Sequence, residues 1–437
     1  MRKPRSAFHP WRSLAAIVFV SSAYAPFAAF AQNQSGKSED WVRMAIENAC
    51  ATDNTDGLSL QTQLPGAWYL NSERSPAGHP VDRSEFIFAL PDGHELRLIY
   101  TRLNGALRRF TADLYRSLDN GKDLQPVMQA QADGACTVRS ARRIVREDDE
   151  NMSLEQLSPD LNEVMWAEPY QASWPAGRDP GGARVALVDS GLAYDLPFFR
   201  NRLARDSAGI PLGYDFWDLD DLPYDGDTAR NLFQPVRHGT PVASIVAREA
   251  PNAALIPFRY PRPDMTRMAD VVARADQSGA RILSMPLGSR READWLAFEA
   301  AMRARPHMLA IVSAGNDGRD IDADRLWPAA LPLENMIVVT SSDAFGHLAD
   351  GSNWGQESVD LMVPAENQQV VDFRGSEGRA SGTSYAVPRI VALAARILEK
   401  RPDLSTADLK SEIFKRATEP QKPGLVAIGW ILDPDRD

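Results

Sequence analysis

The sequence predicts an α/β fold of three layers, in which a mostly parallel central sheet carries helices on both faces, preceded by a smaller α+β domain. Three observations lead to this prediction. After residue 182, short apolar runs alternate with segments of helical periodicity. Such runs are typical of parallel strands buried on both faces, with the intervening helices covering the sheet. Before residue 150 the pattern is mixed, and 437 residues are enough for more than one domain.

Composition excludes several classes of protein. A hydrophobic content of 44% and ten tryptophans argue against a mostly disordered chain. The formal net charge of −11 is opposite to the basic surplus of a nucleic-acid-binding protein, so no nucleic-acid partner is expected. The two cysteines and six histidines are scattered, without the spacing of zinc ligands, and no cofactor is expected.

Residues 1–31 have the order of a secretory signal peptide. Basic residues precede the apolar stretch 14–20, and small residues end in Ala29-Phe30-Ala31, where we expect cleavage. The alternative is an uncleaved membrane anchor, but serines and a proline interrupt the apolar segment. The protein is therefore expected to be exported to the periplasm or the medium, without a stable anchor after cleavage. Thiols oxidise in these compartments, so Cys50 and Cys136 can form a disulfide. The alternative is that they are two separate buried thiols.

Residues 32–150 are expected to form the smaller domain. Its two clearest strands are 84–90 and 95–102, separated by a turn signal. A linker is predicted at 151–182, because 174–182 is dense in proline and glycine and has few apolar anchors.

Residues 183–437 are expected to form one large α/β domain. Its apolar runs predict strands at 185–188, 255–258, 282–285, 309–312 and 337–339. Its helical patterns lie at 241–248, 265–278, 292–303, 383–400 and 405–416.

Four polar residues of this domain stand where strands end or helices begin. Asp189 and Asn316 each follow a buried strand, while His238 and Ser384 each open an amphipathic or apolar helix. The carboxyl ends of parallel strands are where α/β sheets place their active sites. A helix N-terminus offers unpaired N–H groups to a developing negative charge. Taken singly, each residue is also explained as an ordinary turn or capping residue.

The four motifs together, in this order along the chain, resemble the subtilisin-like serine peptidase family, whose triad runs Asp, His, Ser. The resemblance covers residues 183–437. It extends to Ser284–Gly288, which is similar to the substrate-binding strand of the family, and to Trp327–Ala329 after the asparagine. Residues 353–364 resemble the segment before the serine loop.

The resemblance implies a role for each residue. His238 would be the general base, Asp189 would orient its imidazole, and Ser384 would attack the scissile carbonyl to form an acyl-enzyme. The Asn316 amide would help to bind the oxyanion. Backbone groups around residues 286–288 would pair with an extended polypeptide substrate. The implied substrate-binding residues are Pro286, Leu287, Gly288, Ser313, Ala314 and Gly315.

The sequence departs from the family pattern at five positions that flank these motifs. They are Arg237 in place of glycine, Pro241 in place of a second histidine, Tyr385 in place of methionine, Arg389 in place of histidine, and Ala392 in place of glycine. None removes a group that transfers a proton or binds the oxyanion. The predicted function is a serine endopeptidase. The alternatives are a weakly active pseudoprotease or chaperone-like peptide-binding module, and a hydrolase of esters.

Two further features allow two interpretations each. The loop before His238 is rich in acids and is either a structural calcium site or a solvated acidic loop. Its carboxylates belong to Asp215, Asp218, Asp220, Asp221, Asp225 and Asp227. Residues 32 to about 175 are either a removable propeptide, which the resemblance suggests, or a permanent accessory domain.

Overall fold

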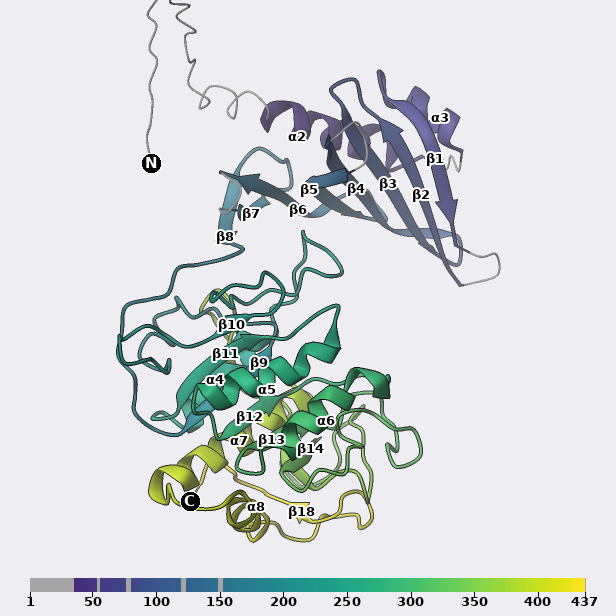
Figure 1. The fold of residues 1–437 in the computed structure, drawn as a ribbon. Coiled ribbons are helices and arrows are strands. Elements are labelled where there is room, and N and C mark those ends of the chain that lie inside the picture. Colours follow the sequence, from purple (N-terminus) through teal and green to yellow (C-terminus); the bar gives the residue numbers. More distant parts are fainter. Residues whose placement is uncertain (1–34, 53–55, 76–79, 119–122, 148–151, 437) are drawn as a thin grey trace, which may run out of the picture. The chain divides into compact units, whose positions relative to one another are not determined.

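The computed structural model describes residues 35–52, 56–75, 80–118, 123–147 and 152–436. The predicted signal peptide, residues 1–31, lies outside the described residues. The chain divides into two units, residues 1–138 and 139–437 (Figure 1). No helix of the described residues is both long enough and apolar enough to span a bilayer.

The first unit is an antiparallel sheet with short helices. The helical elements are α2 (Ser35–Met44), the π-helical turn η1 (Ala45–Ala49) and α3 (Gly57–Thr62). The strands pair in chain order and are β1 (Trp68–Arg74), β2 (Val81–Ala89), β3 (His94–Leu103), β4 (Ala106–Leu118) and β5 (Asp123–Asp133). Elements β2 and β3 contain the two strands expected from the sequence. The predicted α+β domain is thus confirmed as a domain built on an antiparallel sheet.

The core of this unit is aromatic and is cross-linked. Phe86, Tyr100 and Phe110 are buried on three neighbouring strands, and the Tyr100 hydroxyl donates a hydrogen bond to the Ala49 carbonyl at 2.8 Å. Cys50, which follows η1, forms a disulfide with Cys136 beyond β5. Of the two alternatives for these cysteines, the structure shows the disulfide.

The second unit begins with three antiparallel strands, β6 (Val138–Arg146), β7 (Met152–Leu157) and β8 (Val164–Pro169). The stretch 151–182, predicted as a linker, therefore contains two paired strands before its irregular part. Its sequence conceals them because few of their side chains are apolar and buried, Leu154 and Leu157 among them.

A parallel eight-stranded sheet follows, in the order β10-β11-β9-β12-β13-β14-β15-β18. Its central strands are β9 (Arg184–Asp189), β12 (Ile282–Met285), β13 (Leu309–Ser313) and β14 (Met336–Ser342). Toward the two edges lie β11 (Ala254–Arg259), β10 (Tyr214–Asp215), β15 (Leu361–Pro364) and β18 (Gly429–Trp430). Because all the pairs are parallel, the carboxyl ends of the strands meet at one edge of the sheet.

Helices cover both faces of this sheet, which confirms the three-layer prediction. One face packs against α4 (Gly239–Glu249), α7 (Thr383–Lys400) and α8 (Thr406–Phe414). The other face packs against α5 (Met268–Gln277) and α6 (Leu296–Arg303), which follow the short turns η3 (Met265–Arg267) and η4 (Glu292–Asp294). A hairpin of β16 (Gln368–Val371) and β17 (Glu377–Ala380) leads into α7.

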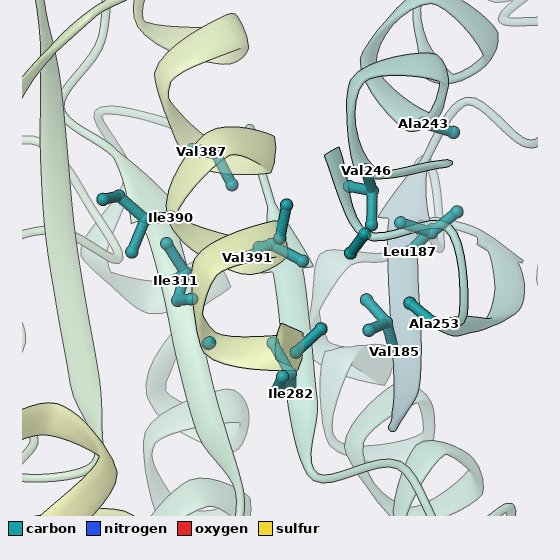
Figure 2. Close-up of a cluster of buried hydrophobic side chains, with 14 of the residues drawn as sticks. Val185, Leu187, Ala243, Val246, Ala253, Ile282, Ile311, Val387, Ile390 and Val391 are labelled. Carbon is teal, nitrogen blue, oxygen red and sulfur yellow. The ribbon is translucent and has the colours of Figure 1, made fainter. Parts of the chain in front are cut away.

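Alternate residues of each strand supply the two cores. Val185 and Leu187 of β9 belong to the core beneath α4 and α7, whereas Ala186 and Val188 belong to the core beneath α5 and α6. Figure 2 shows the first of these cores, where side chains of β9, β12 and β13 meet Val246 and others from α4 and α7. Burial on both faces explains why the strands are apolar at successive positions.

Candidate active site

The predicted site residues come from elements that end or begin at the same edge of the sheet. Asp189 is the last residue of β9, and residues 286–288 and Asn316 follow β12 and β13, its successive neighbours in the sheet. His238 immediately precedes α4, and Ser384 lies in the first turn of α7. Both helix N-termini lie at this edge, because His238 contacts Asp189 and Ser384 Oγ approaches the Pro286 carbonyl just after β12.

Asp189 and His238 form a close pair. His238 Nδ1 lies 2.7 Å from Oδ1 and 2.9 Å from Oδ2 of Asp189. A carboxylate only accepts hydrogen bonds, so the shared proton belongs to Nδ1, and Nε2 is left as the acceptor. The Ser190 N–H donates to Asp189 Oδ1 at 2.7 Å and so fixes the carboxylate.

A buried polar network holds the start of α4. The Ser190 hydroxyl accepts hydrogen bonds from the N–H groups of His238 and Gly239, at 3.1 and 2.9 Å, and donates to Asp225 at 2.6 Å. The other Asp225 oxygen accepts from the Thr240 N–H at 2.9 Å. Neither Ser190 nor Asp225 is assigned to the site from the sequence. The clues that the sequence offers are that Ser190 is adjacent to Asp189 and that Asp225 belongs to the acidic loop.

The pKa of His238 is raised above its ordinary value. Burial lowers this pKa, but the charge and hydrogen bond of Asp189, together with the charge of Asp225, raise it by more. Burial also raises the pKa of Asp225, while its hydrogen bonds from Ser190 and Thr240 and the charge of Arg237 oppose this effect.

Ser384 stands at the N-terminus of α7, and its hydroxyl makes one long contact with the residues that the structure describes. Its Oγ lies 3.5 Å from the Pro286 carbonyl oxygen, a long and weak contact. Among the described residues, Ser384 Oγ and the His238 ring share no hydrogen bond. Gly382 enters the helix with φ +121°, which disfavours other residues, and a Cβ there would lie 3.2 Å from Asn316 Oδ1.

Asn316 is oriented by a hydrogen bond from the same helix start. Its Oδ1 accepts from the Thr383 N–H at 2.9 Å, so its Nδ2 remains the donor of the amide. Asn353 holds the Asn316 loop: its Oδ1 accepts from the N–H groups of Asp317 and Arg319, both at 3.0 Å. In the sequence, Asn353 stands out only as the first residue of the segment 353–364, which resembles the family segment before the serine loop.

The same loop is closed on its other side. Asn353 Nδ2 donates to the Ala314 carbonyl at 2.8 Å. Gly315 has φ +94°, and a Cβ there would lie 2.6 Å from Asn353 Nδ2, so glycine is required. Ser313 ends β13, which places the segment Ser313–Gly315 between the sheet and Asn316.

The predicted substrate segment 286–288 continues from β12. Beyond it, Ser289 and Trp327 exchange backbone hydrogen bonds of 2.8 and 2.9 Å. A Cβ on Gly288 would lie 2.7 Å from the Trp327 carbonyl oxygen, which explains the glycine. The Trp327–Ala329 segment noted in the sequence thus supports the segment 286–288.

Two of the departures from the family pattern make ion pairs with other segments. Arg389 of α7 is buried, and its guanidinium binds Glu249 and Asp435, both at 3.0 Å, and the Pro364 carbonyl at 2.8 Å. Arg237, before the histidine, pairs with Glu168 of β8 at 3.0 Å. The ring of Tyr385 lies 6.2 Å from that of His238, centroid to centroid.

Most carboxylates of the acidic loop have partners within the protein. Arg259 NH1 binds Asp215 at 2.9 Å and Asp218 at 2.8 Å, and the Tyr260 hydroxyl donates to Asp227 at 2.7 Å. Within the described ranges, no group of three or more His, Cys, Asp or Glu side chains is arranged to hold a metal ion. Arg259 therefore pairs with two of the six carboxylates of this loop.

The chain is similar to several known serine proteases. A thermophilic serine proteinase of Bacillus sp. (strain AK1) is 27% identical, over 51% of this chain and 54% of the relative. Halolysin of Haloferax mediterranei is 27% identical, over 57% of this chain and 47% of the relative. The minor extracellular protease Vpr of Bacillus subtilis is 29% identical, over 54% of this chain and 31% of the relative. The chain spans about half the length of the first two relatives, as those shares show. A family model described as the subtilase family matches residues 181–428, more than half of the chain. The chain belongs to the subtilase family.

Proposed function

We propose that this protein is an exported serine endopeptidase. The observation that carries the proposal is the close Asp189–His238 pair at the same sheet edge as Ser384 and Asn316, all within the region matched by the family model. The Nδ1 proton is held by the carboxylate, which leaves Nε2 to act as a base. Ser384 is the hydroxyl at the helix N-terminus of that site.

The reaction begins when Ser384 Oγ turns from the Pro286 carbonyl toward His238. The 3.5 Å contact that is lost is weak, so the rotation costs little. His238 Nε2 takes the hydroxyl proton as Oγ attacks the peptide carbonyl, and it then gives this proton to the leaving amine. Water then attacks the acyl-enzyme: His238 Nε2 takes a proton from this water and gives it to Ser384 Oγ as the acyl–serine bond breaks. Asp189 stabilises the imidazolium formed in each step.

The tetrahedral oxyanion binds between Asn316 Nδ2 and the Ser384 N–H. The hydrogen bond from Thr383 to Asn316 Oδ1 orients the amide before substrate arrives. The first N–H groups of α7 have no partner inside the helix, and the helix dipole adds positive potential. These donors are therefore arranged in advance for the charge that develops in the transition state.

The substrate of this proposal is an extended polypeptide. It pairs with backbone groups of Pro286, Leu287 and Gly288 on one side and of Ser313–Gly315 on the other, since both segments continue from neighbouring strands. Export follows from the predicted signal peptide, and at least one relative is named as an extracellular protease. The signal-peptide pattern of residues 1–31 is consistent with export either to the periplasm or to the medium.

The test is labelling of the intact protein with a fluorophosphonate, followed by mass mapping and an unbiased peptide library. We expect label on Ser384 and cleavage of peptides. Ser384→Ala should abolish both, whereas the control Ser381→Ala, three residues earlier in the same loop, should retain both. An unlabelled folded protein would indicate a peptide-binding module. Labelling with turnover of esters but not of peptides would indicate an esterase.

A further inference from the structure

The strands β6, β7 and β8 lie before the region matched by the family model, yet they contact the loop that leads to His238. Arg142 of β6 donates to the Phe233 carbonyl at 2.6 Å, and the Tyr170 hydroxyl, just after β8, donates to the Leu232 carbonyl at 2.5 Å. Ile144 and Leu154 pack against Phe233 in a small core. The three strands therefore pack against the loop that leads to His238.

Glu168 of β8 joins these strands to two arginines. Its side chain is only 9% exposed, and its two oxygens bind Arg237 NH2 at 3.0 Å and Arg374 Nε at 3.2 Å. Both guanidinium groups also lie over aromatic rings: Arg237 over Phe373 at 3.8 Å and Arg374 over Trp166 at 3.6 Å. Such stacking restricts each arginine to one orientation.

The two arginines belong to the segments that carry the base and the nucleophile. Arg237 immediately precedes His238 and also donates to the Asp225 carbonyl. Arg374 lies in the turn of the β16–β17 hairpin, and β17 leads into Ser384 at the start of α7. One carboxylate from outside the family domain thus connects both halves of the candidate site.

The space around the Arg237 guanidinium is restricted by the neighbouring backbone at Gly226. A Cβ on Gly226 would lie 2.6 Å from Arg237 NH1, so glycine is needed for the arginine to reach its partners. The family pattern has glycine in place of Arg237. Arg237, Gly226 and Glu168 are therefore parts of one arrangement, whose arginine is one of the five departures from the family pattern.

We propose that Glu168 is a positioning residue for catalysis and that β6–β8 stay attached in the active enzyme. This inference rests on the proposed function. Glu168 holds Arg237 and Arg374, and through them the backbone on either side of the site. A displacement of about 1 Å is enough to cost on the order of 100-fold in rate.

The first test compares Glu168→Gln with the matched control Glu155→Gln. Glu155 of β7 pairs with Arg143 of β6 at 2.5 Å, so the control removes an ion pair within the same strands and not one with Arg237 or Arg374. For Glu168→Gln we expect kcat to fall about 10- to 100-fold with KM nearly unchanged. Glu155→Gln should leave both constants unchanged. A folded Glu168→Gln enzyme with the wild-type kcat would overturn the proposal.

The second test needs no variant. The wild-type enzyme is labelled with fluorophosphonate, and the N-terminus of the labelled chain is determined. We expect it to lie before residue 139; a labelled, active chain beginning after residue 170 would overturn the proposal. If Glu168→Gln does not fold, this measurement decides alone. Failure of wild-type protein to label would count against the proposed function, whereas normal wild-type activity with an unaffected Glu168→Gln variant would count against this inference only.

Discussion

The two halves of the candidate site are held in different ways. In the histidine half, Asp189 accepts from His238 and Ser190, and Ser190 in turn connects the start of α4 to buried Asp225. In the serine half, the contact of Ser384 Oγ with the Pro286 carbonyl is long, at 3.5 Å, and the order comes from the helix start, Gly382 and Asn316. The proposed base, His238, is aligned by side chains and charge, and the proposed nucleophile, Ser384, by the start of its helix.

This difference suggests a division of work. A buried network of charged and polar groups is costly to disturb, so the orientation of His238 is set before substrate binds. The Ser384 hydroxyl, whose contact at 3.5 Å is weak, is freer to rotate. Substitutions in the two halves should therefore affect different properties, and the following experiments test this, beginning with the largest expected effect.

Asp189→Asn should have the largest effect in the histidine half. The amide presents a donor where the carboxylate accepted, so the imidazole changes tautomer and loses the charge that stabilises its protonated form. We expect kcat to fall about 10,000-fold, with a parallel loss in the rate of fluorophosphonate labelling. A variant that labels at the wild-type rate would contradict the assigned role of Asp189.

Asn316→Ala should have a smaller effect, confined to the serine half. It removes the Nδ2 donor proposed for the oxyanion, so kcat should fall about 100- to 1,000-fold with KM little changed. The acidic limb of the pH profile should stay in place, because His238 keeps its partners. A rise in KM at constant kcat would show that Asn316 binds substrate rather than the transition state.

The pH profile sharpens the contrast further. A general base must be neutral, and the pKa of His238 is raised by Asp189 and Asp225 beyond the lowering caused by burial. The acidic limb of kcat/KM should therefore have its midpoint above about 6.5, the ordinary histidine value. Asp225→Asn removes one of the two carboxylates and should move this midpoint to lower pH. No movement in a folded Asp225→Asn enzyme would exclude Asp225 as a contributor.

Ser190→Ala should have the smallest effect on activity. It removes the acceptor for two N–H groups at the start of α4 and leaves Asp225 without one of its donors. We expect the free energy of unfolding to fall by about 1–3 kcal/mol, measured by denaturant titration, with a several-fold lower kcat. Unchanged stability would show that this network does not hold the helix.

Much of the architecture was predictable because it is encoded locally. Buried runs such as 282–285 and 309–312 correspond closely to β12 and β13, and their burial on both faces produces a signal within the run itself. The edge strands β10 and β18 are only two residues long, so no periodicity can reveal them. In β7 and β8 the charged and polar residues outnumber the buried apolar ones, which is why the stretch resembled a linker.

The acidic loop shows the same limit at the site. Its sequence shows many carboxylates close together, which is compatible with either a structural calcium site or a solvated acidic loop. One counter-charge in the structure is Arg259, more than forty residues away from Asp215 in the chain. A count of charges in a window cannot identify a counter-charge that arrives from another strand.

The sequence by itself determined the order of the motifs, the strand or helix that carries each of them, and the family. These depend on residue type and short-range periodicity. Only the tertiary structure decided which groups surround them: Asp225 bound to Ser190 at the start of α4, Asn353 bound to the loop of Asn316, and Glu168 joined to Arg374 across 206 residues. Such contacts require the closure of long loops, and their geometry is set by the packing of the whole unit, which no local pattern records.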